Sequence, residues 1–136
     1  MHILDLAIEV TGVQEVRSTR GTARMILFGG TCSGEYFQGV IEPGGVDTQF
    51  LNSDGSGTLS ARYTLSGTAC DGTSARLFIE NNARMGEETH PRIFTVSPCL
   101  AFLETAKLVG HIHSENGHLR ITIDTLDDAP VNSLSE

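Results

Sequence analysis

Apolar and polar residues alternate along short stretches of the chain, which is the pattern of β-strands with one buried face. The clearest alternating stretches are residues 3–10, 58–65 and 74–81. Residues 22–28 are instead apolar on both faces for most of their length, which indicates a strand covered on both sides. These patterns predict a protein built mainly from strands.

Turn sequences separate the predicted strands. Residues 43–45, Pro-Gly-Gly, provide one tight turn, and residues 52–57, Asn-Ser-Asp-Gly-Ser-Gly, provide the strongest hairpin signal. Residues 116–117, Asn-Gly, join a last pair of strands. Gly34 and Gly39 interrupt another strand, and glycines inside a strand mark a bulge, a bend or the close approach of another backbone. A sheet that curls into a barrel needs such points.

The sequence therefore predicts one all-β domain over residues 1–126, followed by a polar tail at residues 127–136. The regular strand spacing and the lack of a convincing amphipathic helix favour a single antiparallel up-and-down β-barrel of about eight strands. Residues 82–102 contain two prolines and no clear period, so we expect one long loop there, with a short helical turn near residues 99–104. The apolar side chains of this loop could cover an opening of the barrel or pack on a second subunit. We favour contact with a second subunit, and hence a homo-oligomer.

The charge of the chain limits its partners. Nine basic and seventeen acidic residues give a formal net charge of −8, which disfavours nucleic acid and anionic membrane surfaces as partners. No apolar run approaches the ~20 residues of a membrane helix. The first ten residues lack the basic region of a signal peptide, so we expect a cytoplasmic protein.

Cysteine usage agrees with that expectation. Cys32, Cys70 and Cys99 are odd in number and include no C-x-x-C pair. A secreted disulfide framework would favour an even set. The sequence thus predicts three reduced, mostly buried thiols.

Several short segments, taken in order, resemble a known family. They are residues 39–47 (Gly-Val-Ile-Glu-Pro-Gly-Gly-Val-Asp), 61–65 (Ala-Arg-Tyr-Thr-Leu), 71–72 (Asp-Gly), 84–86 (Arg-x-Gly), 92–94 (Arg-Ile-Phe) and 103–110. Together they resemble the small β-barrel proteins filed as domain of unknown function 3237, and the resemblance runs from about Leu4 to Ile123. It implies a calycin-like or allene-oxide-cyclase-like barrel, and it implies no established activity.

The chain departs from this family at two places. Thr48 stands where the family has an aromatic residue, and residues 99–104 carry fewer aromatic side chains than the family pattern. If those aromatic side chains line a ligand cavity in the family, the cavity of this protein is wider or differently selective.

Asp47 and Arg62 are the first candidates for a ligand site. At the mouth of a barrel, a carboxylate and a guanidinium could hold a small molecule between apolar walls. Glu35, Asp71 and Arg84 are further candidates for binding the same ligand. The alternative is structural: the aspartates cap turns and the arginines form ion pairs outside the barrel. The sequence does not tell which face of the sheet is the lumen.

Tyr63 raises the possibility of catalysis. With Asp47 as acid and Arg62 as electrostatic clamp, Tyr63 could donate a proton in a cofactor-independent reaction, and Glu35 could serve as its base. The alternative is a packed tyrosine, because Tyr63 shares its strand face with Leu65 and other apolar residues.

His111 and His113 form a weak candidate for a metal site. They lie on the same face of one predicted strand, about 7 Å apart, and Glu115 or His90 could complete the ligand set. A cupin-type site would need further residues that are missing, so two solvent-facing histidines are the alternative. No phosphate-binding glycine motif or nucleophile elbow occurs, and we expect no cofactor.

Three functions remain open at this point. The first is a barrel that binds a small, partly apolar or weakly acidic metabolite in its lumen. The second is a cofactor-independent isomerase, cyclase or lactone hydrolase that uses Asp47, Arg62 and Tyr63. The third is a barrel that serves oligomerisation alone.

Overall fold

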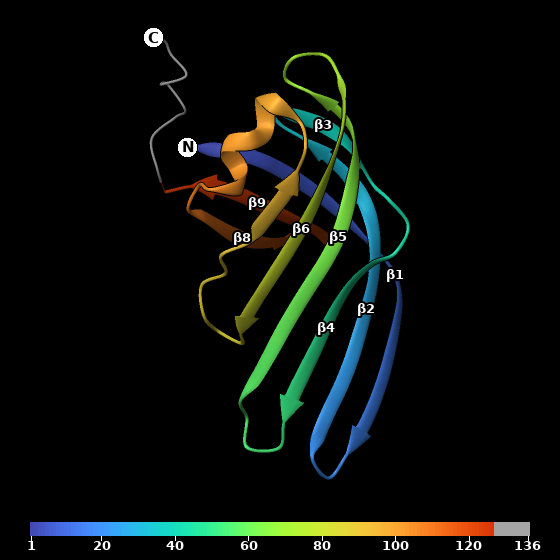
Figure 1. Ribbon diagram of the computed structural model, residues 1–136. Coiled ribbons are helices and arrows are strands. Elements are labelled where there is room, and N and C mark those ends of the chain that lie inside the picture. Colours follow the sequence, from blue (N-terminus) through green and yellow to red (C-terminus); the bar gives the residue numbers. More distant parts are fainter. Residues whose placement is uncertain (127–136) are drawn as a thin grey trace.

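The computed structural model describes residues 1–126 as a strongly curved sheet of nine strands with one short 3-10 helix (Figure 1). The predicted polar tail, residues 127–136, lies outside the described residues. The elements are β1 (His2–Ser18), β2 (Gly21–Ser33), β3 (Phe37–Ile41), β4 (Gly45–Asn52), β5 (Gly57–Ala69), β6 (Ser74–Arg84), β7 (Arg92–Thr95), η1 (Pro98–Glu104), β8 (Leu108–Glu115) and β9 (His118–Thr125).

The strand order confirms the predicted antiparallel barrel. All pairings are antiparallel, and the order is β7-β6-β5-β3-β2-β1-β9-β8, with β4 also pairing with β2 and β5. Strands β3 and β4 therefore share one position between β2 and β5, separated by the Pro43-Gly44 turn. The nine strands thus occupy eight positions around the barrel.

The two ends of the sheet meet at a short seam. Thr89 and Gly110 form an antiparallel bridge, in which Gly110 N–H donates to the Thr89 carbonyl at 3.0 Å. The Thr89 hydroxyl donates to the Gly110 carbonyl, also at 3.0 Å. A ring nitrogen of His90 adds a contact of 2.9 Å to the Leu108 carbonyl. The seam is therefore narrow but made by both backbone and side chains.

Helix η1 packs against the buried core of the barrel. Leu100 and Leu103 of η1 are fully buried in the core. The Glu104 carboxylate accepts a hydrogen bond of 3.0 Å from Thr95 N–H. Because Thr95 lies on β7, at one end of the strand order, this bond occupies a donor that an open sheet edge would expose.

The barrel has two halves that differ in packing. In the closed half, buried aliphatic side chains such as Leu4, Leu65 and Leu77 fill the interior. The other half, which we call the open half, consists of residues 10–28 of β1–β2 and residues 45–62 of β4–β5. These two hairpins extend beyond the rest of the barrel (Figure 1). The interior is therefore a solid core at one end and an accessible inner face at the other.

Residue pairing tells which side chains face inward in the open half. Phe28 is buried and its ring makes an edge contact with buried Tyr63, with centroids 5.3 Å apart. Inward positions continue from Phe28 at every second residue of β2. On β1, a register shift between Val10 and Gly12 marks a bulge, and Val13 then pairs with inward Ile26. Val10 and Val13 remain 48% and 56% exposed, so the inner face of this half meets solvent.

Gly39, one of the two glycines predicted to interrupt a strand, allows two backbones to approach closely. It pairs with Gly67 of β5, and a Cβ atom on either glycine would overlap a backbone oxygen of the neighbouring strand. Only glycine allows the two strands to come this close.

The region predicted as one long loop, residues 82–102, contains more structure than expected. Strand β6 continues to Arg84, and β7 and the start of η1 follow. The helical turn was predicted, but β7 has only four residues, too few for a visible period. Ile93 points into the core and is buried, whereas Phe94 and Val96 remain exposed. Part of the apolar surface that we assigned to a second subunit is therefore buried within the chain itself.

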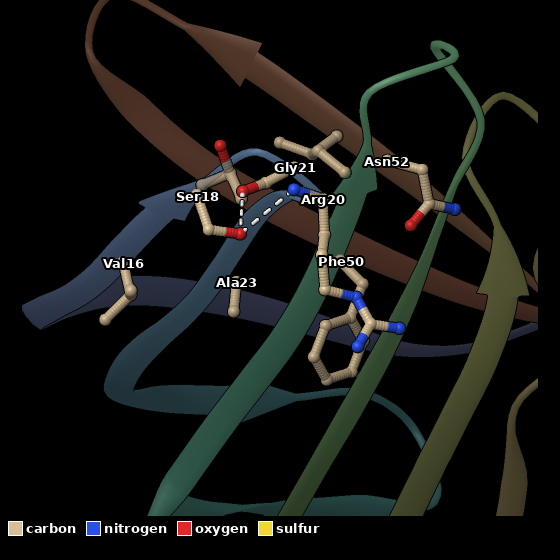
Figure 2. A pocket seen from close by; sticks show the side chains of 9 residues that line it. Val16, Ser18, Arg20, Gly21, Ala23, Phe50 and Asn52 are labelled. Carbon is tan, nitrogen blue, oxygen red and sulfur yellow. Dashed lines mark hydrogen bonds between the residues drawn. The ribbon is translucent and has the colours of Figure 1, made fainter.

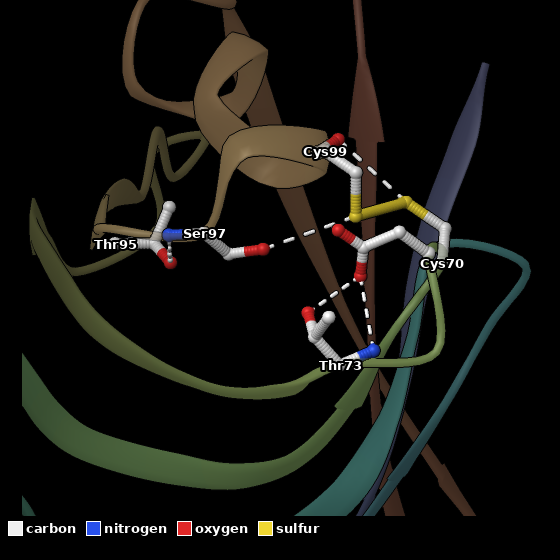
Figure 3. The surroundings of a disulfide bond; sticks show 6 residues. Cys70, Thr73, Thr95, Ser97 and Cys99 are labelled. Atoms are coloured by element: carbon white, nitrogen blue, oxygen red, sulfur yellow. Dashed lines mark hydrogen bonds between the residues drawn. A yellow bond between two sulfur atoms is a disulfide. The ribbon is translucent and has the colours of Figure 1, made fainter.

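The prediction of three reduced thiols was wrong. Cys70 and Cys99 form a disulfide that joins the β5–β6 turn to η1 (Figure 3). Their Cα atoms lie 6.3 Å apart although 29 positions separate them in sequence. Only the wrapping of the sheet brings this turn to η1, so cysteine spacing could not reveal the pair. Cys32 is free and buried, and burial raises the pKa of its thiol to about 12.

Among residues 1–126, no helix has the length and apolar character that a membrane crossing requires.

Candidate functional site

Asp47 lies on the inner face of the open half. It pairs with Ile26 on β2 and with Ala61 on β5, and Ala61 pairs in turn with Asn81 on β6. Directly paired residues point to the same face of a sheet. The four residues therefore form one row across the inner face, with the small Ala61 side chain between the carboxyl group of Asp47 and the amide of Asn81.

A chain of hydrogen bonds leads to Asp47 along the same face. Arg24 donates to Glu15 at 2.8 Å and to the Gln49 side-chain oxygen at 3.2 Å. Gln49 then donates to Oδ2 of Asp47 at 2.9 Å. We call Glu15, Arg24, Gln49 and Asp47 the inner polar chain. Arg24, the nearest cation in this chain of hydrogen bonds, forms its ion pair with Glu15 and not with Asp47. Among the described residues, no cation forms an ion pair with Asp47.

Two acceptor atoms in the Asp47–Asn81 row lack donors. Within residues 1–126, Oδ1 of Asp47 and Oδ1 of Asn81 are buried and have no hydrogen-bond partner. Buried polar side-chain atoms in proteins are usually hydrogen-bonded, and each exception requires an explanation. A bound molecule that supplies N–H or O–H donors is one such explanation.

The environment of Asp47 also changes its acidity. Burial raises the pKa of Asp47, and the Gln49 amide and the nearby Ser60 backbone offset only part of this effect. A carboxylate that is partly desolvated and lacks a full set of donors accepts a proton or a hydrogen bond more readily. The site can therefore bind a donor group and can exchange a proton with it.

Arg62, the expected partner of Asp47, is not brought to it. Arg62 pairs with Val46, the residue before Asp47, and consecutive residues of a strand point to opposite faces. Its guanidinium lies outside the barrel, 3.2 Å from the Glu80 carboxylate, which also binds Arg92 at 2.6 Å. The two residues therefore cannot hold the same ligand from one face of the sheet.

Tyr63 does lie inside, but within the core. Its side chain is buried against Phe28, and burial raises the pKa of its hydroxyl above the ordinary value. This is the packed tyrosine that the sequence allowed as the alternative. A catalytic site built from Asp47, Arg62 and Tyr63 is thus not assembled in this structure.

The other ligand-binding candidates are scattered. Glu35 is exposed in the bend between β2 and β3. Asp71 lies in the β5–β6 turn, where its Oδ1 accepts bonds from the backbone and hydroxyl of Thr73 at 3.1 and 2.6 Å. Arg84 ends β6 on the outer face, paired with Thr58. None of the three belongs to the inner polar chain.

The two histidines of β8 are exposed. The rings of His111 and His113 are 6.5 Å apart; His111 lies 4.0 Å from Asp124, and His113 lies 3.3 Å from the Thr122 hydroxyl. In the part of the chain that the structure describes, no group of three or more His, Cys, Asp or Glu side chains is placed to hold a metal ion.

Sequence reasoning missed Glu15, Arg24, Gln49 and Asn81. One signal was available for Arg24, because it is a charge within the otherwise apolar run of residues 22–28. An arginine there requires an acidic or amide partner on a neighbouring strand. Its partners could not be named without the strand register.

Comparisons with known proteins agree with the barrel. A solved protein of unknown function from Clostridium acetobutylicum has a TM-score of 0.75 and 24% identity, covering 90% of this chain and 93% of that one. A β-barrel-like protein from Acinetobacter baumannii also has a TM-score of 0.75, at 21% identity, covering 93% and 94%. An enzyme from Penicillium herquei has a TM-score of 0.70 and 16% identity, covering 91% and 92%. At these identities the likeness shows the fold alone.

A UPF0311 protein of Clostridium acetobutylicum is 43% identical over 56 residues, which cover 41% of this chain and 33% of that protein. The matched region thus spans about a third of that relative. The model of the family described as "Protein of unknown function (DUF3237)" matches residues 1–88. This match covers more than half of the chain, and the chain therefore belongs to the DUF3237 family.

Proposed function

We propose that the protein binds a small, partly apolar molecule on the inner face of the open half, in contact with Asp47. The observation that carries the proposal is the pair of buried acceptors without donors, Oδ1 of Asp47 and Oδ1 of Asn81. A ligand with a hydroxyl or N–H group would provide the missing donor, and an unpaired buried acceptor costs roughly 1–3 kcal/mol.

The surroundings of Asp47 suit such a ligand. Val10, Val13 and Ile26 give the same face apolar surface, which a ligand can cover. Both acceptor oxygens lie beneath neighbouring atoms, so the ligand reaches them after a rotation of the carboxyl or amide group. Such terminal torsions have broad minima and rotate at low cost.

A thermal-shift screen against a metabolite set tests the proposal. A ligand at a hundred times its dissociation constant adds about 2.7 kcal/mol of stability. Asp47→Asn keeps an oxygen for Gln49 but removes the charge, and it should abolish the shift produced by any hit. Glu9→Gln, the same kind of change at an exposed carboxylate, is the matched control and should preserve it. A hit that stabilises both variants equally would place the ligand elsewhere and contradict the proposal.

A second candidate function is proton transfer by Asp47 in a cofactor-independent isomerisation or cyclisation. The raised pKa of Asp47 favours it, because a carboxylate with a raised pKa is a better general base. One solved protein of this fold is described as an enzyme, although it shares only 16% identity. Once the screen has identified a ligand, its conversion can be measured. Conversion by the wild type but not by Asp47→Asn would support catalysis over binding alone.

Self-association is a separate proposal. Phe78 and Phe94 lie together on the outer face, with ring centroids 5.9 Å apart, and Arg92 lies over the Phe94 ring at 5.1 Å. Aromatic residues and arginine are enriched at protein interfaces. Light scattering after size-exclusion chromatography would detect a dimer, and Phe94→Ser should shift the protein to a monomer.

A further inference from the structure

A pocket lies on the outer face of the sheet, at the tips of the β1–β2 and β4–β5 hairpins (Figure 2). Its volume is about 510 Å³, within the range of roughly 300–1,000 Å³ that is usual for ligand pockets. This pocket is separate from the proposed Asp47 site, because the exposed apolar side chains that line it, Val16, Ala23 and Phe50, lie on the face of the sheet opposite to Asp47.

The apolar side of the pocket is formed by one row of side chains. Val16 pairs with Ala23, and Ala23 pairs with Phe50, so the three side chains lie next to each other across β1, β2 and β4. Val16 is 69% exposed and Phe50 is 50% exposed. This is a continuous apolar surface that the described residues leave open.

Arg20 supplies the charged side of the pocket. The β1–β2 turn holds its backbone in place: Arg20 N–H donates to the Ser18 hydroxyl at 3.2 Å, and the Arg20 carbonyl accepts from Ser53 N–H at 3.0 Å. Figure 2 shows its side chain extended alongside Phe50. Among residues 1–126, its guanidinium has no hydrogen bond or ion pair.

This lack of a partner contrasts with the other arginines. The arginines that form ion pairs with carboxylates are Arg17, Arg24, Arg62, Arg76, Arg92 and Arg120. Arg84 is the other arginine of the described chain without such a pair, and it lies in the same outer row, opposite Thr58, which in turn pairs with Phe50. Two arginines without an ion pair therefore lie in this outer row, in a chain whose net charge is −8: Arg20 in the pocket and Arg84 two strands from Phe50.

Within residues 1–126, the acidic residues nearest to Arg20 form no ion pair with it. Asp54, in the β4–β5 turn, accepts bonds from the backbone and hydroxyl of Ser56 at 2.9 and 2.6 Å. Glu15, near in sequence, belongs to the inner polar chain and is bound by Arg17 and Arg24. The positive charge of Arg20 is thus available to a ligand.

We propose that this pocket binds a small carboxylate attached to an apolar, preferably aromatic, group. The carboxylate would take both nitrogens of the Arg20 fork, the geometry in which guanidinium and carboxylate pair most strongly. The apolar group would lie on the Val16–Ala23–Phe50 row. Small hydrophilic anions would gain nothing from that row, and uncharged apolar molecules would gain nothing from Arg20.

Titration calorimetry or NMR titration with 3-phenylpropionate tests this proposal, and its uncharged amide serves as the matched ligand. The acid should bind at least about tenfold more tightly than the amide, because a charge-assisted bidentate pair is lost with the amide. Arg20→Gln should remove this preference by weakening binding of the acid and not of the amide. Phe50→Thr, which keeps a good strand former, should weaken both ligands.

Arg17→Gln is the matched control, since Arg17 belongs to the same hairpin tip but is already paired with Glu15. This variant should bind both ligands like the wild type. The proposal is overturned if the acid and the amide bind equally, if neither binds, or if Arg20→Gln leaves binding of the acid unchanged. Asp47 lies on the opposite face of the sheet, so Asp47→Asn should leave binding of the acid intact. Failure of this proposal is therefore distinguishable from failure of the proposed Asp47 site.

Discussion

Two hydrogen bonds between Thr89 and Gly110 join the two ends of the sheet: the Gly110 amide donates to the Thr89 carbonyl, and the Thr89 hydroxyl donates to the Gly110 carbonyl. A Cβ atom on Gly110 would lie 2.8 Å from Oγ1 of Thr89. Absence of a side chain at residue 110 is therefore a condition for this seam.

Gly110→Ala should destabilise the protein by about 1–2 kcal/mol, because the hydroxyl must rotate away and lose its bond to the Gly110 carbonyl. Urea unfolding followed by circular dichroism measures the change. Gly29→Ala is the control, since nothing lies within 4 Å of a Cβ atom there. Equal losses for the two variants would show that the seam has no special requirement for glycine.

Removal of the Cys70–Cys99 disulfide should lower the free energy of unfolding by about 2–4 kcal/mol, because the bond closes a loop of 29 positions. Guanidinium unfolding of the wild type with and without dithiothreitol measures this difference. The Cys70→Ser/Cys99→Ser double variant should be insensitive to the reductant. Sensitivity that persists in the double variant would have to arise at Cys32, and the assignment would be wrong.

His2 should give the protein a pH-dependent stability. Its ring nitrogens lie 2.8 Å from Asp124 and 2.9 Å from Asp5, and these hydrogen bonds raise its pKa above the ordinary value of 6.5. The carboxylates are shared with two other groups: Arg120 binds Asp5 at 2.7 Å, and His111 lies 4.0 Å from Asp124.

Because the pKa of His2 is higher in the folded state, its stabilising contribution is complete below about pH 6.5 and is lost as the pH rises through the folded-state value. The free energy of unfolding, measured between about pH 5.5 and 8.5, should fall more for the wild type than for His2→Gln. Parallel curves for the two proteins would contradict the assignment. The lowered pKa of Asp5 acts in a different range, since its contribution is lost as the pH falls below the ordinary aspartate value.

Asp47 should act in the opposite way to a stabilising carboxylate. Burial raises its pKa, so the folded state is favoured when Asp47 is protonated, and this advantage is lost as the pH rises through the raised pKa. Asp47→Asn should therefore be more stable than the wild type at pH 7 and should lose that advantage near pH 3.5, as thermal unfolding at the two pH values would show. A less stable variant at pH 7 would mean that the carboxylate has a stabilising partner. Residues that bind ligands often reduce stability in this way.

The sequence carried most of the information on the fold because strand periodicity and turn chemistry are local. Alternation identified β1, β5 and β6, and the Asn116-Gly117 turn identified the β8–β9 hairpin. What local patterns could not provide was register. Arg62 and Ala61 are neighbours in sequence, and a shift of one residue decides which of them faces Asp47.

The candidate site was predicted only in part for the same reason. Asp47 was singled out, but its hydrogen-bonded neighbours Arg24 and Gln49 lie on strands whose alignment is set by the whole sheet. The contact between Cys70 and Cys99 likewise depends on how far the sheet curls. These relationships are long-range, and no single stretch of sequence encodes them.

The shared position of β3 and β4 has a consequence for how this protein can change. The turn at Pro43-Gly44 divides one barrel position into a strand whose ends, Phe37 and Ile41, belong to the core and a strand that carries Asp47 and Phe50 on its two faces. The core side chains of β3 and the candidate binding residues of β4 therefore lie on different segments. Substitutions on β4 should therefore change the chemistry of either surface with little effect on the buried aliphatic core at the other end of the barrel.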